Sequence, residues 1–155
     1  MESDRIEVLI GGGFNLAHRY ARAATNRALR ELGLDLRHLG VLGQLAQLGP
    51  VPQQALVDRL QLDKSSMVYV IDELERQGLA ERRRSEEDRR RYAVHLTELG
   101  RTRLGEATTV SAEAMADLLT PFTAAEREQL HELLTRFVAH AATPVRTAGA
   151  RPGDD

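Results

Sequence analysis

The hydrophobic period of this chain changes at Gly78, and that change restricts the available folds more than any other feature. Before Gly78, the stretch "DKSSMVYVIDELERQGL" opens with Asp63, a good helix N-cap, and repeats apolar residues every three to four positions. Those residues are Met67, Val70, Ile71 and Leu74. After Gly78, apolar residues in 92–96 fall on alternate positions, as in a half-buried strand. The pattern predicts a helix followed by a β-hairpin, in which 79–84 pairs with 92–96.

Two further helices precede the one that starts at Asp63. The stretch "LDLRHLGVLGQLAQLG" predicts a helix that ends at Gly49 and Pro50, and "PQQALVDRLQL" predicts a short helix begun by proline. The short helix and its successor are joined by a tight turn. Together with the hairpin they form the outline of a winged helix-turn-helix, whose second helix can enter a major groove.

Long helices are predicted on both sides of this core. The glycines at 11–13 weaken the first one, and we expect a close helix crossing or fraying there, because no strand precedes them as a phosphate-binding loop requires. The last helix begins with the capping box "TAAE" at Thr123. The first and last helices carry apolar stripes outside the core, so they need a partner surface, which a two-fold dimer would supply.

The predicted fold is mainly α with a small β-hairpin wing, in a single domain followed by a polar tail. The expected divisions are a domain over 5–142, a winged lobe at about 34–97, dimerisation helices at about 5–32 and 98–141, and a disordered tail over 143–155.

Composition removes several classes of function. The chain has no cysteine, which excludes disulfides, thiolate metal sites and cysteine nucleophiles. We find no catalytic motif and no metal-ligand spacing, and therefore expect no enzyme, no cofactor and no metal site. No apolar run reaches the roughly 20 residues that span a bilayer, and the N-terminus is acidic where a secretory signal is basic, so we expect a cytoplasmic protein.

The segment "RRRSEEDRRRY", from Arg82 to Tyr92, places two arginine triplets on the predicted hairpin of a chain whose net charge is only −2. Such a segment is usually a solvated, self-compensated loop. Its place directly after a helix-turn-helix favours a wing that reaches the DNA backbone or minor groove, where guanidinium groups bind well. The acids between the triplets reduce repulsion, and Asp88 could brace a neighbouring arginine.

The stretch "LDKSSMVYVIDELERQGLAERRRSEEDRRRYAVHLTELG" resembles the winged-helix core of the MarR family of bacterial transcriptional regulators, with "DRRRYAVHLTELG" as its specific part. The resemblance implies a homodimer that binds double-stranded DNA at a pseudo-palindromic operator and represses transcription until a small aromatic or phenolic effector weakens binding. It also implies the DNA contacts. These are Lys64, Ser65, Ser66 and Tyr69 on the recognition helix, Arg90 beside Asp88 at the wing tip, and Arg82, Arg84, Arg89 and Arg91 as backbone contacts.

The recognition helix departs from the family pattern. Val68 and Tyr69 stand where threonine and arginine are frequent, and Glu73 replaces another frequent arginine. The alternative function is therefore a protein-interaction module whose recognition helix binds a protein partner. Salt dependence separates the two, because DNA affinity falls with a log–log slope of about −0.9 per phosphate neutralised.

The resemblance also implies an effector site between the dimerisation helices and the winged lobe. The candidate ligand-binding residues are His18 and Arg22, one helical turn apart, with His38 on the next helix. Histidine with arginine could hold a carboxylate, although each histidine could equally be a surface or satisfied interior residue.

Overall fold

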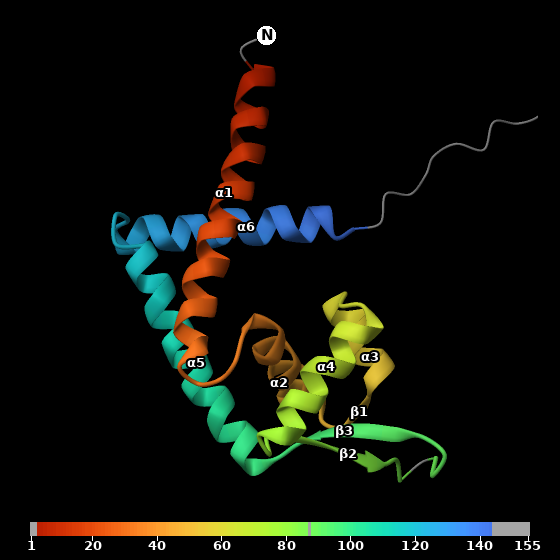
Figure 1. Ribbon diagram of the computed structural model, residues 1–155. Coiled ribbons are helices and arrows are strands. Elements are labelled where there is room, and N and C mark those ends of the chain that lie inside the picture. The colour runs from red at the N-terminus through yellow and green to blue at the C-terminus, as the bar shows by residue number, and fades with distance from the viewer. Residues whose placement is uncertain (1–2, 87, 144–155) are drawn as a thin grey trace, which may run out of the picture. The chain divides into compact units, whose positions relative to one another are not determined.

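The computed structural model describes residues 3–86 and 88–143, which form helices and one small antiparallel sheet (Figure 1). The elements, in chain order, are α1 (Ser3–Arg30), α2 (Leu36–Leu48), β1 (Val51–Pro52), α3 (Gln53–Leu60), α4 (Lys64–Arg76), β2 (Ala80–Arg84), β3 (Tyr92–Leu96), α5 (Glu98–Leu118) and α6 (Ala124–Ala141). The predicted mainly helical winged helix-turn-helix is confirmed. Apart from Thr143, the tail predicted to be disordered lies outside the described residues.

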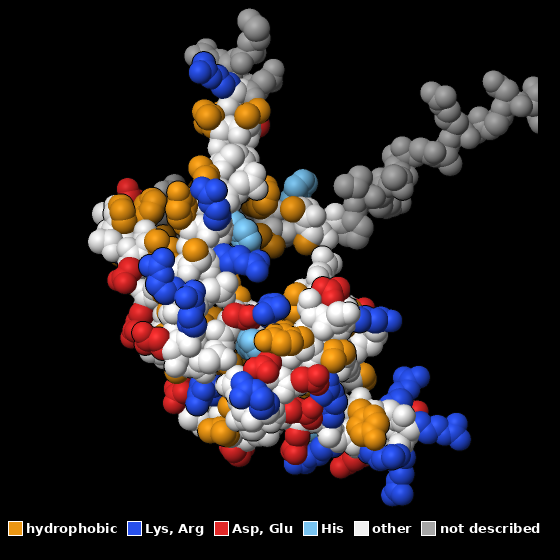
Figure 2. Space-filling view, viewed as in Figure 1, with side chains coloured by type: hydrophobic (Ala, Val, Ile, Leu, Met, Phe, Trp, Pro, Cys, Tyr) orange, Lys and Arg blue, Asp and Glu red, His pale blue; other side chains and the backbone are white. Residues whose placement is uncertain are grey.

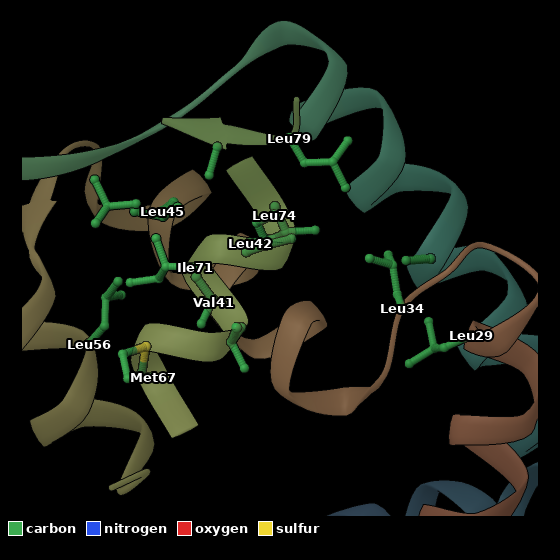
Figure 3. Packing of buried hydrophobic residues seen from close by; sticks show 14 residues of the cluster. Leu29, Leu34, Val41, Leu42, Leu45, Leu56, Met67, Ile71, Leu74 and Leu79 are labelled. Atoms are coloured by element: carbon green, nitrogen blue, oxygen red, sulfur yellow. The ribbon is translucent and has the colours of Figure 1, made fainter. Parts of the chain in front are cut away.

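The chain forms two compact units, the first ending at Leu118 and the second beginning at Leu119. The first unit contains α1 to α5 and the sheet, and its core lies between α2, α3 and α4 and extends to Leu29 of α1, Val94 of β3 and Ala107 of α5. Figure 3 shows Leu42, Ile71 and Leu74 packed together where α2 meets α4. All four apolar residues predicted for the inward face of α4 are completely buried, so packing fixes which face of α4 points outward.

The sheet has the strand order β1-β3-β2, with β3 in the centre. β2 and β3 pair as the predicted hairpin, from Ala80 opposite Leu96 to Arg84 opposite Tyr92. β1 was not predicted from the sequence. It is a two-residue strand in which Val51 pairs with Val94, and it connects the start of α3 to the base of the wing.

The "LTELG" motif joins the wing to α5. The Thr97 hydroxyl donates to the Gly78 carbonyl at 2.7 Å and accepts from the Gly100 backbone N–H at 2.9 Å, so it connects the end of α4 to the first turn of α5. A Cβ built on Gly100 would lie 1.9 Å from the Leu79 carbonyl oxygen. Only glycine allows this approach, which places the wing directly against α5.

α1 runs through its three glycines without interruption. In the part of the chain that the structure describes, no atom lies within 4 Å of a Cβ built on Gly11, Gly12 or Gly13, the helix's own nearby backbone aside. The expected close helix crossing is therefore not seen at these glycines among the described residues. Fraying is not observed either, since α1 begins at Ser3.

The second unit contains α6, which starts with the predicted capping box. The Glu126 backbone N–H donates to Thr123 Oγ1 at 3.3 Å, and Glu126 Oε2 accepts from the Thr123 N–H at 2.8 Å. The pKa of Glu126 is lowered by the bond that its carboxylate accepts from the Thr123 N–H and, second, by the one it accepts from the Thr123 hydroxyl at 2.9 Å. The box fixes where α6 begins.

Candidate nucleic-acid interface

α4 presents one face to solvent, and its start is held by Asp63. Asp63 accepts from the Ser66 backbone N–H at 2.8 Å and from the Ser66 hydroxyl at 2.6 Å, and the pKa of Asp63 is lowered mainly by that hydroxyl. The Ser66 side chain is thus committed to the cap, whereas Lys64 and Ser65 are exposed at the same end of the helix. Of the predicted contacts here, Lys64 and Ser65 are the accessible ones.

β2 and β3 extend away from the helices as a wing (Figure 1), and backbone bonds shape its tip. The Ser85 N–H donates to the Arg91 carbonyl at 2.8 Å, which closes the loop. Asp88 organises the far end, because its Oδ1 accepts from the Arg90 N–H at 2.9 Å and its Oδ2 lies 3.6 Å from Arg91 Nε. The expected ion pair between Asp88 and a neighbouring arginine is therefore present.

The arginines of the wing differ in what occupies their side chains. Arg84 donates to the Arg89 carbonyl at 2.9 Å and lies over the Tyr92 ring, 5.6 Å from its centroid. Among residues 3–86 and 88–143, no carboxylate lies within ion-pair distance of Arg89 or Arg90. Figure 2 shows Lys and Arg side chains gathered at the projecting end of the wing. The tip therefore offers to an anion guanidinium groups that no described carboxylate compensates.

Arg82 faces inward, toward α4 and α3. Its Nη1 lies 2.7 Å from Asp72 Oδ1 and also forms an ion pair with Glu75, while Nε and Nη2 donate to Gln53 Oε1 at 3.4 and 3.3 Å. The Arg82 backbone N–H donates to Glu75 Oε1 at 2.6 Å. None of its three partners, Gln53, Asp72 and Glu75, was singled out from the sequence. Because its guanidinium is already occupied, Arg82 is better placed to hold the wing against α4 than to contact a phosphate.

Tyr69 is the only aromatic residue of α4 and is exposed over 55% of its surface. The guanidinium of Arg37, from α2, lies 5.8 Å from its ring centroid, within the range of a cation–π contact. Arg37 is fixed in turn by Asp35, whose Oδ2 is 2.6 Å from Nη2. The ring is thus supported from α2 while its outer surface stays accessible.

The Asp35 carboxylate also caps the start of α2 and contacts the His38 side chain there. Asp35 Oδ1 accepts from the backbone N–H groups of Arg37 and His38 at 2.8 and 3.3 Å and lies 2.9 Å from His38 Nδ1. Burial raises the pKa of Asp35, but the Arg37 hydrogen bond, the His38 charge and the two N–H groups outweigh burial and leave the pKa at about 2. Asp35 is therefore ionised at neutral pH.

His38 borders a hollow of about 370 Å³ that α4 closes on one side with Tyr69 and Glu73. The His38 side chain is 93% buried, and its Nε2 has no hydrogen-bond partner within the described residues. Arg22 instead borders a separate hollow of about 180 Å³ with Arg37 and Leu60, and His18 is exposed on α1. The structure does not gather His18, Arg22 and His38 around one cavity.

The described residues give no support to a metal site or to a membrane-spanning helix. Within the described ranges, no group of three or more histidine, aspartate or glutamate side chains is arranged to hold a metal ion. Likewise, no described helix is long and apolar enough to cross a membrane.

Comparison with known proteins identifies relatives of the whole winged architecture. Residues 32–91 match the model of the MarR family. The chain is 31% identical over 133 residues to the uncharacterized HTH-type transcriptional regulator YkoM of Bacillus subtilis (strain 168), a match that covers 82% of this chain and 86% of the relative.

Solved structures agree with this assignment. A probable transcriptional regulator from Pseudomonas aeruginosa is 29% identical, with a TM-score of 0.72 over 83% of this chain and 96% of that one. CouR from Rhodococcus jostii RHA1, bound to p-coumaroyl-CoA, is 27% identical, with a TM-score of 0.69 over 83% and 90%. Wild-type MarR from E. coli in its apo form shares the fold at a TM-score of 0.75 over 83% and 96%, with 21% identity.

Proposed function

The chain belongs to the MarR family of transcriptional regulators, and on that premise we propose that it is a homodimeric repressor that an anionic aromatic effector releases from a pseudo-palindromic operator. The observation that carries the DNA-binding part is the wing tip, where Arg89 and Arg90 have no acidic partner within the described residues. Arg82 holds this wing to α4, so the guanidinium groups and the recognition helix form one surface.

We assign the DNA contacts by what each side chain is free to do. Lys64 and Ser65 at the start of α4 and Arg89 and Arg90 on the wing are available for phosphates and base edges. Arg91 and Asp88 shape the tip, and Arg84 supports it through the Arg89 carbonyl. Ser66 serves the helix cap, and Arg82 serves the wing.

The dimer is supported by apolar side chains that the described chain leaves exposed on α1 and, separately, on α6. They are Ile6 (50%), Val8 (71%), Leu9 (62%), Ile10 (50%) and Leu16 (50%) on α1, and Leu133 (48%), Leu134 (39%) and Val138 (60%) on α6. Large exposed apolar surfaces of this kind mark interaction sites. A two-fold dimer would place the two α4 helices in successive major grooves, roughly 34 to 36 Å apart.

Sedimentation velocity tests the dimer. Leu9→Glu places a charge in the exposed apolar part of α1 and should yield monomers at micromolar concentration. Gln54→Glu introduces the same group on an exposed polar site of α3 and should leave the dimer intact. A monomeric wild-type chain would rule out the dimer.

The effector site is supported by the hollow beside His38. Its two acids are already compensated, since Asp35 pairs with Arg37 and Glu73 with Arg76 at 2.8 Å. Arg30, which also borders the hollow, has no ion-pair partner within the described residues. One uncompensated cation beside the unpartnered His38 Nε2 favours a small ligand with an anionic group and a second polar group.

DNA binding and effector response are tested together. A labelled duplex from upstream of the chain's own gene should be retained against excess nonspecific DNA, and benzoate or cinnamate derivatives should release it. Arg30→Ala should raise the effector concentration needed for release, whereas Arg101→Ala, an exposed arginine on α5, should not. Absence of DNA binding together with capture of a protein through α4 would favour the protein-interaction alternative.

A further inference from the structure

The outward face of α4 is apolar at its centre. The residues that point away from the buried face are Ser65, Val68, Tyr69 and Asp72. Val68 is exposed over 42% of its surface and Tyr69 over 55%, and no described residue covers either completely. A recognition helix with this face presents methyl groups and one ring where charged or amide side chains usually contact bases.

Basic side chains are present on α4 only at its ends. Lys64 is its first residue, and Arg76 near its end is paired with Glu73 at 2.8 Å. Guanine is recognised through its N7 and O6 acceptors by bidentate arginine or lysine, and the middle of α4 offers neither. Asp72, which could accept from cytosine N4, is held by Arg82 at 2.7 Å. The centre of α4 is therefore poorly suited to G·C pairs.

Val68 is suited to a different base. A β-branched side chain in a helix is held largely in one rotamer, so its two methyl groups have fixed positions. In the major groove, only thymine among the four bases carries an apolar substituent, its C5-methyl group. Covering that methyl with Val68 would remove apolar surface of both from water, which is favourable.

The charges around Val68 fit a nucleic acid better than a protein surface. Lys64 precedes it by one helical turn, and Arg89 and Arg90 lie on the wing that Arg82 fastens to α4. Asp72, one turn after Val68, is already paired with Arg82. An apolar centre that has a cation one turn before it and arginines on the adjoining wing suits a major groove, where methyl groups lie between two phosphate backbones.

We propose that Val68 recognises the C5-methyl group of a thymine in each operator half-site, so that this regulator selects A·T pairs under the middle of α4 by apolar contact. The proposal rests on the proposed function, since it assumes that α4 enters the major groove.

Thymine replacement tests the contact directly. A duplex that binds the full-length chain is selected from a random pool, and each thymine of one half-site is then replaced singly by deoxyuridine, which lacks only the C5-methyl. Burying one methyl-sized group changes the free energy of binding by an amount that corresponds to about a four-fold change in affinity. One of the replacements should therefore weaken wild-type binding about four-fold. The other replacements in that half-site should have little effect.

Matched variants assign the contact to Val68. In Val68→Ala, the sensitive replacement should lose most of its effect, because the two γ-methyl groups that covered the thymine methyl are gone and only Cβ remains. Arg101→Ala, at an exposed position of α5 outside the proposed DNA contacts, should keep the four-fold sensitivity. Both positions are exposed, so circular dichroism should show the same fold for all three proteins.

The outcomes distinguish failure of the proposed DNA binding from failure of the Val68–thymine contact. If no duplex from the pool is retained, the proposed function itself fails. If duplexes are retained but every deoxyuridine replacement binds like thymine, regulation through DNA stands and the methyl contact is refuted. A sensitive thymine whose effect persists unchanged in Val68→Ala would also refute the assignment to Val68.

Discussion

Replacing Arg82 by alanine should loosen the wing without removing any residue proposed to contact DNA. Among the described residues, Arg82 is the one wing arginine with partners on both α3 and α4, and its side chain is only 25% exposed. A hydrogen bond to a charged group contributes about 1.5–3 kcal/mol, and an exposed ion pair about 0.2–1 kcal/mol. The contact with Glu75, which is 32% exposed, lies nearer the first range, and that with Asp72, 58% exposed, nearer the second.

The Arg82 backbone N–H keeps its bond to Glu75 in the variant, so only the side-chain contacts are lost. We therefore expect Arg82→Ala to lower the free energy of unfolding by about 2 kcal/mol. For a chain of this size, each kcal/mol lowers the melting temperature by about 2–4 °C, so the expected shift is about 4–8 °C. Thermal unfolding followed by circular dichroism measures it.

DNA affinity should fall as well, by about ten-fold, because two carboxylates of α4 lose their positive partner beside the phosphates. Arg83→Ala is the matched control, since Arg83 pairs only with Glu81 among the described residues and is 61% exposed. It should shift the melting temperature by about 4 °C at most and by less than Arg82→Ala does. Combining Arg82→Ala with Asp72→Asn should restore part of the affinity. Equal losses in Arg82→Ala and Arg83→Ala would refute the bracing role.

Two other substitutions test the packing and the cap. Gly100→Ala should lower the free energy of unfolding, measured in urea, by about 3 kcal/mol, because its Cβ would meet the Leu79 carbonyl. Gly105→Ala, with open space around its Cβ, should instead stabilise α5 by about 0.5–1 kcal/mol. Similar effects at both sites would contradict the close approach of Gly100 to Leu79. For Asp35, whose pKa of about 2 lies below its usual value of 3.8, the stabilisation is complete above about pH 4 and is lost as the pH falls toward 2. The difference in unfolding free energy between wild type and Asp35→Asn should thus be constant from pH 7 to about pH 5 and shrink below pH 4. A difference that stays the same down to pH 2 would show that the carboxylate charge does not contribute to stability.

Local signals in the sequence were enough to predict most of the winged core. The Asp63 cap, the apolar spacing of α4 and the alternation in 92–96 each depend on neighbours a few residues away, and all three are present in the structure. The Thr123 capping box was predicted for the same reason. The resemblance to the MarR family likewise rested on one continuous stretch of sequence, and residues 32–91 match the model of that family.

Features that depend on distant contacts were missed. β1 contains Pro52 and only one other residue, so it has no strand pattern of its own and exists through pairing with β3. The partner of Asp35 in its capping box is His38, where glutamate or glutamine is usual. Nothing in "RRRSEEDRRR" distinguishes Arg82 from Arg83, because their difference comes from acids on α4.

The candidate ligand residues show the same limit. His18 and Arg22 were paired by helical spacing alone, but spacing does not reveal which cavity each side chain borders. His38 was predicted as a ligand-binding residue from the chemistry of its side chain. The observation that supports this prediction is its buried Nε2 without a partner among the described residues, and that burial comes from elements other than α2. Arg30 was not a candidate, because only the three-dimensional structure shows that it borders the hollow and that no described carboxylate pairs with it.

The wing tip's part in DNA binding is tested most directly by the salt dependence of operator affinity for wild type, Arg90→Ala and Arg146→Ala. Arg90 has no acidic partner among the described residues, and Arg146 lies outside them. Wild type and Arg146→Ala should bind alike, while Arg90→Ala should bind more weakly in both half-sites and show a log–log salt slope that is smaller by about 2 per dimer. Equal affinities and slopes for all three proteins would contradict DNA binding through the wing.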